Sequence, residues 1–234
     1  MTNTPEALDL YALSETLLPN AEAQTYLYNL YYDLLDELRP ASVLDIGCGS
    51  GAFLEGIAQR FEDTEAMGID LSCEMVRRAQ ARGVRAECID VCELTQSFDA
   101  ATAVFDMVNY LPADALAPFF ACVEARLKPG GYFMFDINTL FGFEHVAVGA
   151  YIAEDATRFL AVDSDFDDGI YRADFHLFDR QGERYRRLSD TITQYFHPIE
   201  TIERATSMRL VQRRDIALYD LGEADKTVLV FQKL

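Results

Sequence analysis

The chain has 234 residues, of which 50% are hydrophobic and 25% charged, as expected for one globular α/β domain with a large core. Its 39 acidic residues outnumber its 20 basic residues, so its net charge is −19. Nucleic acid is therefore not an expected partner, because binding it depends on Lys and Arg that neutralise phosphates. We attribute most of the charge to solubility, and it is also compatible with a cationic or amine substrate.

The sequence predicts no membrane partner and no metal site. No apolar stretch approaches the roughly 20 residues of a membrane span. Residues 1–9 lack the regions of a secretory signal, so we expect a cytoplasmic protein, either a monomer or a homodimer. The five cysteines include no CxxC pair and no cluster of zinc spacing. We expect them to be reduced and mostly buried.

In chain order, the sequence first predicts two helices in residues 6–38, separated by Pro19, and then alternating strands and helices. Such alternation indicates a parallel sheet with helices on both faces. The expected strands start at Ser42 or Val43 and cover 66–70, 84–90, 100–105 and 132–136, and the expected helices cover 52–62, the residues between Ser72 and Gly83, and 116–127.

The pattern changes near Gly149. From there to His197 we expect three antiparallel strands, with turns at 167–169 and 179–182. The acidic run in 163–168 lacks the glycine and terminal Glu of a calcium-binding loop, so we interpret it as a solvated hairpin end. A short helix over 199–207 and a final hairpin of strands 210–218 and 227–231 complete the prediction.

The segment from Val43 to Gly51 is the most informative part of the chain. A short apolar run carries Asp45 and then opens into Gly47, Gly49 and Gly51, directly before a helical stripe. Glycine permits a positive φ and lets a ligand approach the backbone, and the helix start supplies unpaired N–H groups. This unit predicts a cradle for a nucleoside cofactor.

The pattern alone leaves the cofactor open. Gly47-x-Gly49-x-x-Ala52, with Asp70 further on, also satisfies the dinucleotide pattern. Three features favour S-adenosylmethionine (SAM). Asp45 precedes the first glycine, where its carboxylate can meet an ammonium group and bound water. Gly51 adds a third alternating glycine, and Asp90 ends the third strand, where it can accept a hydrogen bond from the adenine amino group.

The chain resembles the class I SAM-dependent methyltransferases. The motifs that carry the resemblance are 44–51, 68–72, 88–91 and 128–132, in family order and spacing. More loosely, 105–111 and the insertion are similar to the subgroup that includes aminosugar N-methyltransferases. The resemblance implies a single α/β domain with a doubly wound, mostly parallel seven-stranded sheet. Its expected parts are a helical lid (1–39), a cofactor-binding core (40–148), a three-stranded antiparallel insertion (149–198), and a final helix and strand hairpin (199–234).

The resemblance also implies how the cofactor is held, with S-adenosylhomocysteine (SAH) as the product. The glycine turn would pass the methionine part, and Asp70 would bind both ribose hydroxyls. Asp90 and Val91 would read adenine, and Leu71 and Met75 would pack on its faces. The expected cofactor residues are Tyr11 of the lid, Asp45, Gly47, Cys48, Gly49, Gly51, Asp70, Leu71, Met75, Asp90, Val91, Phe105, Asp106 and Met107.

The acceptor end is less well defined. Residues 106–109 are not the N/D-P-P-Y/F loop used on planar amide or base nitrogens, which argues against DNA bases and protein glutamine. Methyl transfer to a small molecule is expected, first to an amine and next to a hydroxyl, while an oxidoreductase and a non-catalytic SAM-binding module stay open. The candidate catalytic residues are Asn109, Tyr110, His145 and His176; His197 is expected in a turn, and Phe141, Phe143, Tyr151 and Tyr171 are candidates for the pocket wall.

Overall fold

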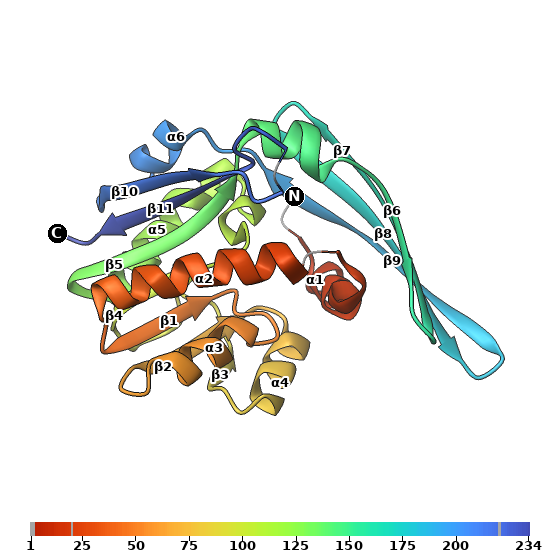
Figure 1. The fold of residues 1–234 in the computed structure, drawn as a ribbon, viewed down its shortest axis with the longest axis horizontal. Helices are drawn as coiled ribbons and strands as arrows, with labels where there is room; N and C mark the ends of the chain where they lie inside the picture. Colours follow the sequence, from red (N-terminus) through yellow and green to blue (C-terminus); the bar gives the residue numbers. More distant parts are fainter. Residues whose placement is uncertain (1–2, 20, 220) are drawn as a thin grey trace.

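A seven-stranded sheet, here sheet A, forms the centre of the computed structural model, which describes residues 3–19, 21–219 and 221–234 (Figure 1). The strand order is β10-β11-β5-β4-β1-β2-β3. These strands are β1 (Ser42–Ile46), β2 (Glu65–Asp70), β3 (Ala86–Cys88), β4 (Phe98–Ala103), β5 (Leu127–Asn138), β10 (Arg209–Ile216) and β11 (Lys226–Gln232).

The pairing of β1 shows at which edge of sheet A a ligand is expected to bind. β1 pairs in parallel with β2 on one side and with β4 on the other, so the winding direction reverses between β1 and β4. In such sheets ligands bind outside the carboxyl ends of the strands at this reversal. β11 runs antiparallel to both of its neighbours, β5 and β10, whereas the other neighbouring strands of sheet A pair in parallel. The predicted doubly wound, mostly parallel seven-stranded sheet is confirmed.

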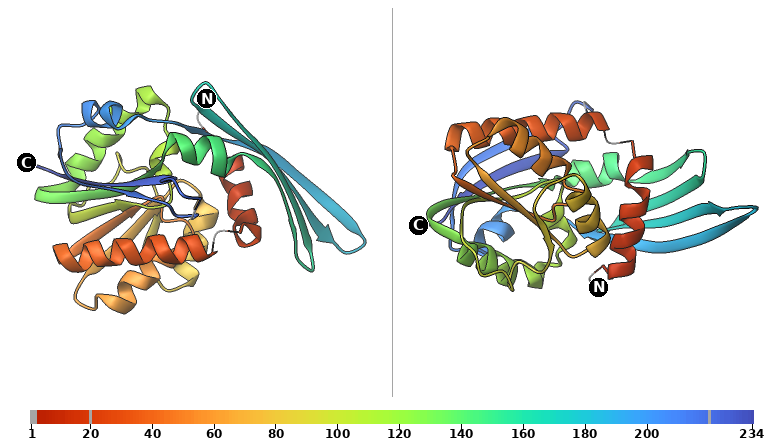
Figure 2. Two further views of the ribbon diagram at one scale, coloured as in Figure 1. Left: turned by 45° about the horizontal axis from the view of Figure 1, so that its top comes forward. Right: turned by 90° about the horizontal axis from the view of Figure 1, so that it is seen from below.

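Helices cover both faces of sheet A (Figure 2). One core cluster packs Phe120 of α5 and Ile202 of α6 against the sheet, and the other packs Tyr31 of α2 and Phe53 of α3 on the opposite face. Burial of these side chains supplies most of the driving force for folding. The helices are α1 (Pro5–Ser14), α2 (Ala21–Leu38), α3 (Ala52–Arg60), α4 (Cys73–Ala81), α5 (Ala113–Arg126) and α6 (Ile199–Arg204), with short helical turns η1 (Glu15–Leu17), η2 (Met107–Tyr110) and η3 (Gly142–Ala147).

The insertion forms a second sheet, here sheet B, that projects from the core (Figures 1 and 2). The prediction of three strands was wrong, because residues 149–154 pair with β7 as a further strand. The intervening turn is held by the carboxylate of Asp155, which accepts the backbone N–H groups of Thr157 and Arg158 at 2.8 Å each. The four antiparallel strands are β6 (Gly149–Glu154), β7 (Arg158–Asp167), β8 (Ile170–Gln181) and β9 (Arg184–Tyr195).

The cysteines also differ from the prediction. Cys73 pairs with Cys88 and Cys92 pairs with Cys122, and only Cys48 is a free, buried thiol. The expectation of reduced cysteines was therefore wrong for four of the five. Chain spacing gave no sign of these pairs, because each joins segments that become neighbours only after β3 and α5 pack against the core. Separately, none of the helices in the described ranges combines the length and apolar character that a membrane crossing requires.

Candidate cofactor and acceptor site

The glycine turn after β1 has the backbone that the sequence indicated. Gly47, Gly49 and Gly51 have φ values of 72°, 52° and 80°. The glycines are needed for different reasons. A Cβ on Gly51 would lie 2.8 Å from side-chain atoms of Ala79 and Val84, so this glycine permits close packing. A Cβ on Gly49 would meet no protein atom within 4 Å, so this position is open.

A cavity of about 310 Å³, here the first cavity, lies at the carboxyl ends of β1, β2 and β4. Most of the predicted cofactor residues line it together. They are Tyr11, Gly47, Cys48, Gly49, Asp70, Leu71, Met75, Asp90, Val91, Phe105 and Met107.

Asp70 is fixed at the mouth of the glycine turn. Its carboxylate accepts the backbone N–H of Gly49 at 2.9 Å and that of Ser72 at 2.8 Å. Burial raises the pKa of Asp70, and these two hydrogen bonds oppose that rise. A carboxylate has about four acceptor positions, so two remain for a pair of hydroxyl groups. The orientation of Asp70 is set before any ligand binds.

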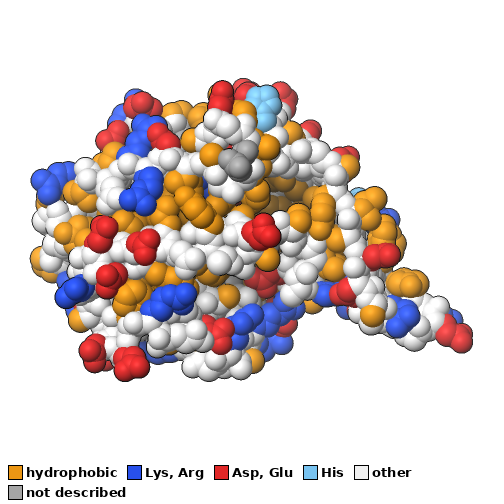
Figure 3. Space-filling view, in the orientation of Figure 1, with side chains coloured by type: hydrophobic (Ala, Val, Ile, Leu, Met, Phe, Trp, Pro, Cys, Tyr) orange, Lys and Arg blue, Asp and Glu red, His pale blue; other side chains and the backbone are white. Residues whose placement is uncertain are grey.

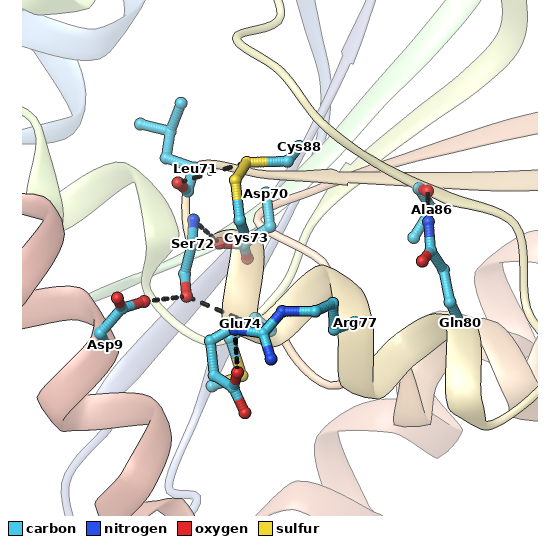
Figure 4. The surroundings of a disulfide bond; sticks show 11 residues. Asp9, Asp70, Leu71, Ser72, Cys73, Glu74, Arg77, Gln80, Ala86 and Cys88 are labelled. Carbon is cyan, nitrogen blue, oxygen red and sulfur yellow. Dashed lines mark hydrogen bonds and ion pairs between the residues drawn. A yellow bond between two sulfur atoms is a disulfide. The ribbon is translucent and has the colours of Figure 1, made fainter.

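Asp90 lies in the loop after β3, because that strand ends at Cys88 rather than at Asp90 as predicted. The disulfides anchor this loop on both sides. Cys88 is bonded to Cys73 at the start of α4, close to Leu71 and Asp70 (Figure 4), and Cys92 is bonded to Cys122 of α5. The Asp90 carboxylate also accepts the backbone N–H of Cys92 at 2.7 Å.

The N-terminal helix α1 closes the first cavity. Asp9 accepts the hydroxyl of Ser72 at 2.6 Å (Figure 4), and Glu15 of the following turn accepts the hydroxyl of Ser50 at 3.1 Å. On its other side, α1 packs on the inner face of sheet B, where Tyr11 makes an edge contact with Phe175. This segment therefore lies between the cofactor core and the insertion.

Three predicted cofactor residues do not line the first cavity: Asp45, Gly51 and Asp106. Asp45 is 2% exposed and accepts the Thr102 hydroxyl at 2.8 Å. Its burial raises its pKa to about 7, despite the opposing effect of Thr102. Gly51 packs closely against Ala79 and Val84 at the start of α3. Asp106 lines a different cavity.

That cavity, here the second cavity, has a volume of about 500 Å³ and lies between sheet B and the core. Hydrophobic side chains gather around the hollow where sheet B joins the core (Figure 3). Tyr11, Phe105 and Tyr110 line both cavities and so mark the boundary between them. The aromatic lining is completed by Tyr151, Tyr171, Phe175 and Tyr219.

A buried charged network forms the polar part of the second cavity. Lys226 is 2% exposed and donates to Asp106 at 2.6 Å and to Asn138 at 2.9 Å. It also pairs with Asp136 at 3.2 Å. Gln194 of β9 donates to the other oxygen of Asp106. The two nearby carboxylates raise the pKa of Lys226 above its usual range, against the lowering effect of burial, so it stays charged.

Of the predicted catalytic residues, only Tyr110 lines a cavity. Asn109 is fully buried. Its side-chain NH₂ donates to the Tyr195 carbonyl, and its side-chain oxygen accepts the backbone N–H of Asn138. His145 is exposed on η3, and its ring contacts that of Phe141 at a tilt of 50°. His176 alternates with Phe175 on β8, so it lies on the opposite face of sheet B, beside Arg187.

Of the four aromatic residues predicted for the pocket wall, two line a cavity. Tyr151 and Tyr171 line the second cavity, whereas Phe141 and Phe143 do not. His197 is buried, hydrogen-bonded to the Leu111 carbonyl, and burial lowers its pKa. It lies between β9 and α6 in a segment to which no turn is assigned.

Sequence reasoning missed several lining residues. Gln24 and Tyr28 line the first cavity and lie one turn apart on α2, a spacing that could have identified them. Lys226 is a charged residue at the start of the apolar strand β11, and Gln194 lies near the end of the alternating strand β9. Nothing in the sequence connects either of them to Asp106, 120 and 88 residues away.

Residues 43–131 match the family model of the methyltransferase domain. The ubiquinone biosynthesis O-methyltransferase of Xanthomonas oryzae is 36% identical over 130 residues, 50% of this chain and 52% of that protein. The chain thus spans about half the length of the curated relatives it matches. This alignment relates the chain to methyltransferases through one half of its residues.

Solved structures extend the similarity to the whole fold. A SAM-dependent methyltransferase from Clostridium acetobutylicum has a TM-score of 0.74 at 23% identity, with 97% of both chains covered. The SAM-bound amino pentose methyltransferase CalS10 from Micromonospora echinaspora has a TM-score of 0.65 at 24% identity, covering 89% of this chain and 92% of that one. The chain has a class I methyltransferase fold.

Proposed function

We propose that this protein is a SAM-dependent methyltransferase that methylates an amine nitrogen of a small molecule. The observation that carries the proposal is the meeting of the two cavities at Tyr11, Phe105 and Tyr110. The first cavity has the donors and acceptors for a nucleoside with an amino-acid tail. The second is a separate space, lined in part by aromatic side chains, that an acceptor can enter.

In this proposal SAM lies in the first cavity. Asp70 accepts the two ribose hydroxyls, and Asp90 with Val91 contacts adenine. The methionine part passes Gly47 and Gly49 toward the boundary of the cavities. SAM supplies the electrophilic methyl group, and the protein orients the two reactants, which in aligned systems contributes about 7–11 kcal/mol.

The transfer is an in-line displacement. A bond forms between the acceptor nitrogen and the methyl carbon while the carbon–sulfur bond breaks, and its electron pair stays on sulfur, giving SAH. An acceptor that binds as an ammonium ion first releases one proton to solvent, because only the neutral amine has the electron pair that forms this bond. A hydroxyl acceptor would need a base, and His145, His176 and His197, the three histidines of the chain, line neither cavity. Burial raises the pKa of Tyr110 well above its usual value, so its hydroxyl stays protonated. These features favour an amine.

O-methylation is the second candidate, because the curated relative named above is an O-methyltransferase. That match covers only half of the chain, so it bears less on the acceptor than on the cofactor. A cytoplasmic location and a monomeric or homodimeric state remain predictions.

Calorimetric titration with SAM, SAH and NADH tests the cofactor, and transfer from labelled SAM to a panel of amines, alcohols and phenols tests the reaction. Asp70→Ala should weaken SAM binding by at least about 100-fold, since two charge-assisted hydrogen bonds are lost. The matched control is Asp163→Asn, an exposed carboxylate of β7 that lines neither cavity. NADH binding without SAM binding would indicate an oxidoreductase, and tight SAM binding without any transfer would indicate a non-catalytic module.

A further inference from the structure

We propose that Asp106 selects the acceptor by binding its positively charged ammonium group. The inference rests on the proposed function and names the class of acceptor. The sequence motif suggested that Asp106 contacts the cofactor, but its side chain lines the second cavity and not the first. Its neighbour Phe105 lines both. A nitrogen held by Asp106 therefore lies beside the boundary that the methyl group must cross.

Among the described residues that line the second cavity, Asp106 and Asp225 are acidic and Lys226 is basic. Lys226 is 2% exposed, donates hydrogen bonds to Asp106 and Asn138, and forms an ion pair with Asp136. Asp225 accepts the backbone N–H groups of Leu218 and Tyr219 and is only 1% exposed, so its carboxylate is not accessible to an acceptor. An anionic acceptor would thus find no available cation at this position.

Asp106 retains the capacity to bind a donor. One of its oxygens accepts from Lys226 and the other from Gln194, and its side chain is 16% exposed. Because a carboxylate offers about four acceptor positions, about two remain. Asp106 and Asp136 together carry two negative charges against the single charge of Lys226, so the network has a net charge of −1. An ammonium group would neutralise it.

The walls of the second cavity suit the same ligand. Tyr11, Tyr110, Tyr151 and Tyr171 line it, and aromatic faces attract a cation through their quadrupoles. A neutral alcohol of the same shape would gain neither this attraction nor the charge-assisted bond to Asp106. The cavity therefore discriminates between an amine and its alcohol analogue by charge.

The backbone at Asp106 is held in a strained conformation. Phe105 and Asp106 have φ values of 66° and 51°, in the left-handed region that side chains other than glycine rarely adopt. Asp136 accepts the backbone N–H groups of both residues at 2.8 Å each. Such strained backbone persists where the surroundings enforce it, commonly at functional sites. Here it directs the Asp106 carboxylate into the cavity.

The test compares 2-phenylethylamine, 2-phenylethanol and 3-phenylpropanoate by calorimetric titration, with the protein alone and with SAH bound. The amine should bind at least 10-fold more tightly than the alcohol, and the carboxylate should bind most weakly. Asp106→Asn should abolish the preference for the amine while SAM affinity changes less than 3-fold. Asp163→Asn should keep both properties.

The inference would be overturned if the wild-type protein bound the alcohol or the carboxylate as tightly as the amine, or if it bound no amine. It would also be overturned if the preference for the amine survived Asp106→Asn. The wild-type comparison stands even if the variant does not fold. Failure of the proposed function is seen separately, as absence of SAM binding, and the titrations without SAH then still test Asp106.

Discussion

The buried carboxylate of Asp136 accepts the backbone N–H of Asp106 at 2.8 Å, and so fixes Asp106, in the loop after β4, in a left-handed conformation. The same carboxylate accepts the N–H of Phe105 and the hydroxyl of Tyr31. Through Asp136, the end of β5 and the helix α2 both determine where Asp106 points. The boundary between the first and second cavities therefore depends on a residue that lines neither of them.

Asp136→Asn should destabilise the protein by about 3–5 kcal/mol, because it breaks a buried charge pair with Lys226 and leaves one backbone N–H facing an amide NH₂ group. Tyr31→Phe is the matched control. It removes one hydrogen bond to the same carboxylate and should cost about 1 kcal/mol. Urea unfolding curves measure both. Equal losses for the two variants would show that Asp136 does not organise the turn.

Alanine substitutions should separate the roles of two glycines in the cofactor turn. Gly51→Ala should lower the free energy of unfolding by about 2–3 kcal/mol, because its Cβ crowds Ala79 and Val84. Gly49→Ala has open space and adds only the cost of its positive φ, about 1–2 kcal/mol. If the turn cradles SAM, Gly49→Ala should nevertheless weaken SAM binding more than 10-fold.

Thermal unfolding and SAM titration on both variants check this prediction. The Tm should fall further for Gly51→Ala. An unchanged SAM affinity in Gly49→Ala would contradict the close approach of the cofactor to this backbone.

The first cavity could be predicted because its determinants are local. In a parallel sheet the carboxyl ends of neighbouring strands meet at one edge, so Asp70 and Asp90 were expected near Gly49 from their predicted places at the ends of the second and third strands. The second cavity depends on contacts distant in sequence. Asp106 meets Gln194 only after sheet B packs against the core, and no periodicity within either segment encodes that contact.

The insertion and the cysteines illustrate the same limit. The alternation of Tyr171, Ala173 and Phe175 predicted β8, because a half-buried strand repeats every two residues. β6 is short and its residues 150–153 are all apolar, so its sequence shows no such alternation. The disulfides join α4 to β3 and the next loop to α5, which is a property of the packed chain.

Removing the disulfide that lies beside Asp70 should weaken both the fold and the cofactor site. Cys73→Ser with Cys88→Ser should lower the free energy of unfolding by about 3 kcal/mol, as expected for a loop of this length, 15 residues. SAM affinity should also fall, because the loops that carry Leu71 and Asp90 are no longer tied together. Cys92→Ser with Cys122→Ser is the comparison, since this pair lies on the far side of the Asp90 loop.

Titration of SAM into both double variants and into the dithiol-reduced wild type measures the effect. Reduction of both disulfides in the wild type should lower SAM affinity by as much as the two double variants do together. Unchanged SAM affinity in the Cys73/Cys88 variant would show that this disulfide stabilises the fold without shaping the site.

Asp45 should make the stability of the SAM-free protein depend on pH. Its folded-state pKa is about 7, raised chiefly by burial from an ordinary value of 3.8. Between about pH 4 and pH 7 the unfolded chain loses this proton while the folded protein keeps it. Ionisation therefore favours the unfolded state, and the contribution of Asp45 to stability is lost as the pH rises through this range. The shift corresponds to a loss of about 4 kcal/mol.

Asp45→Asn keeps the hydrogen bond from Thr102 and cannot ionise. Relative to the wild type it should therefore gain stability from about pH 4 to about pH 7 and level off above that range, as measured by urea unfolding at each pH. Thr102→Val removes the hydrogen bond that favours the ionised form, so it should move the wild-type transition to higher pH. Parallel pH profiles for the wild type and Asp45→Asn would mean that Asp45 is ionised throughout this range, with a compensating charge inside the fold.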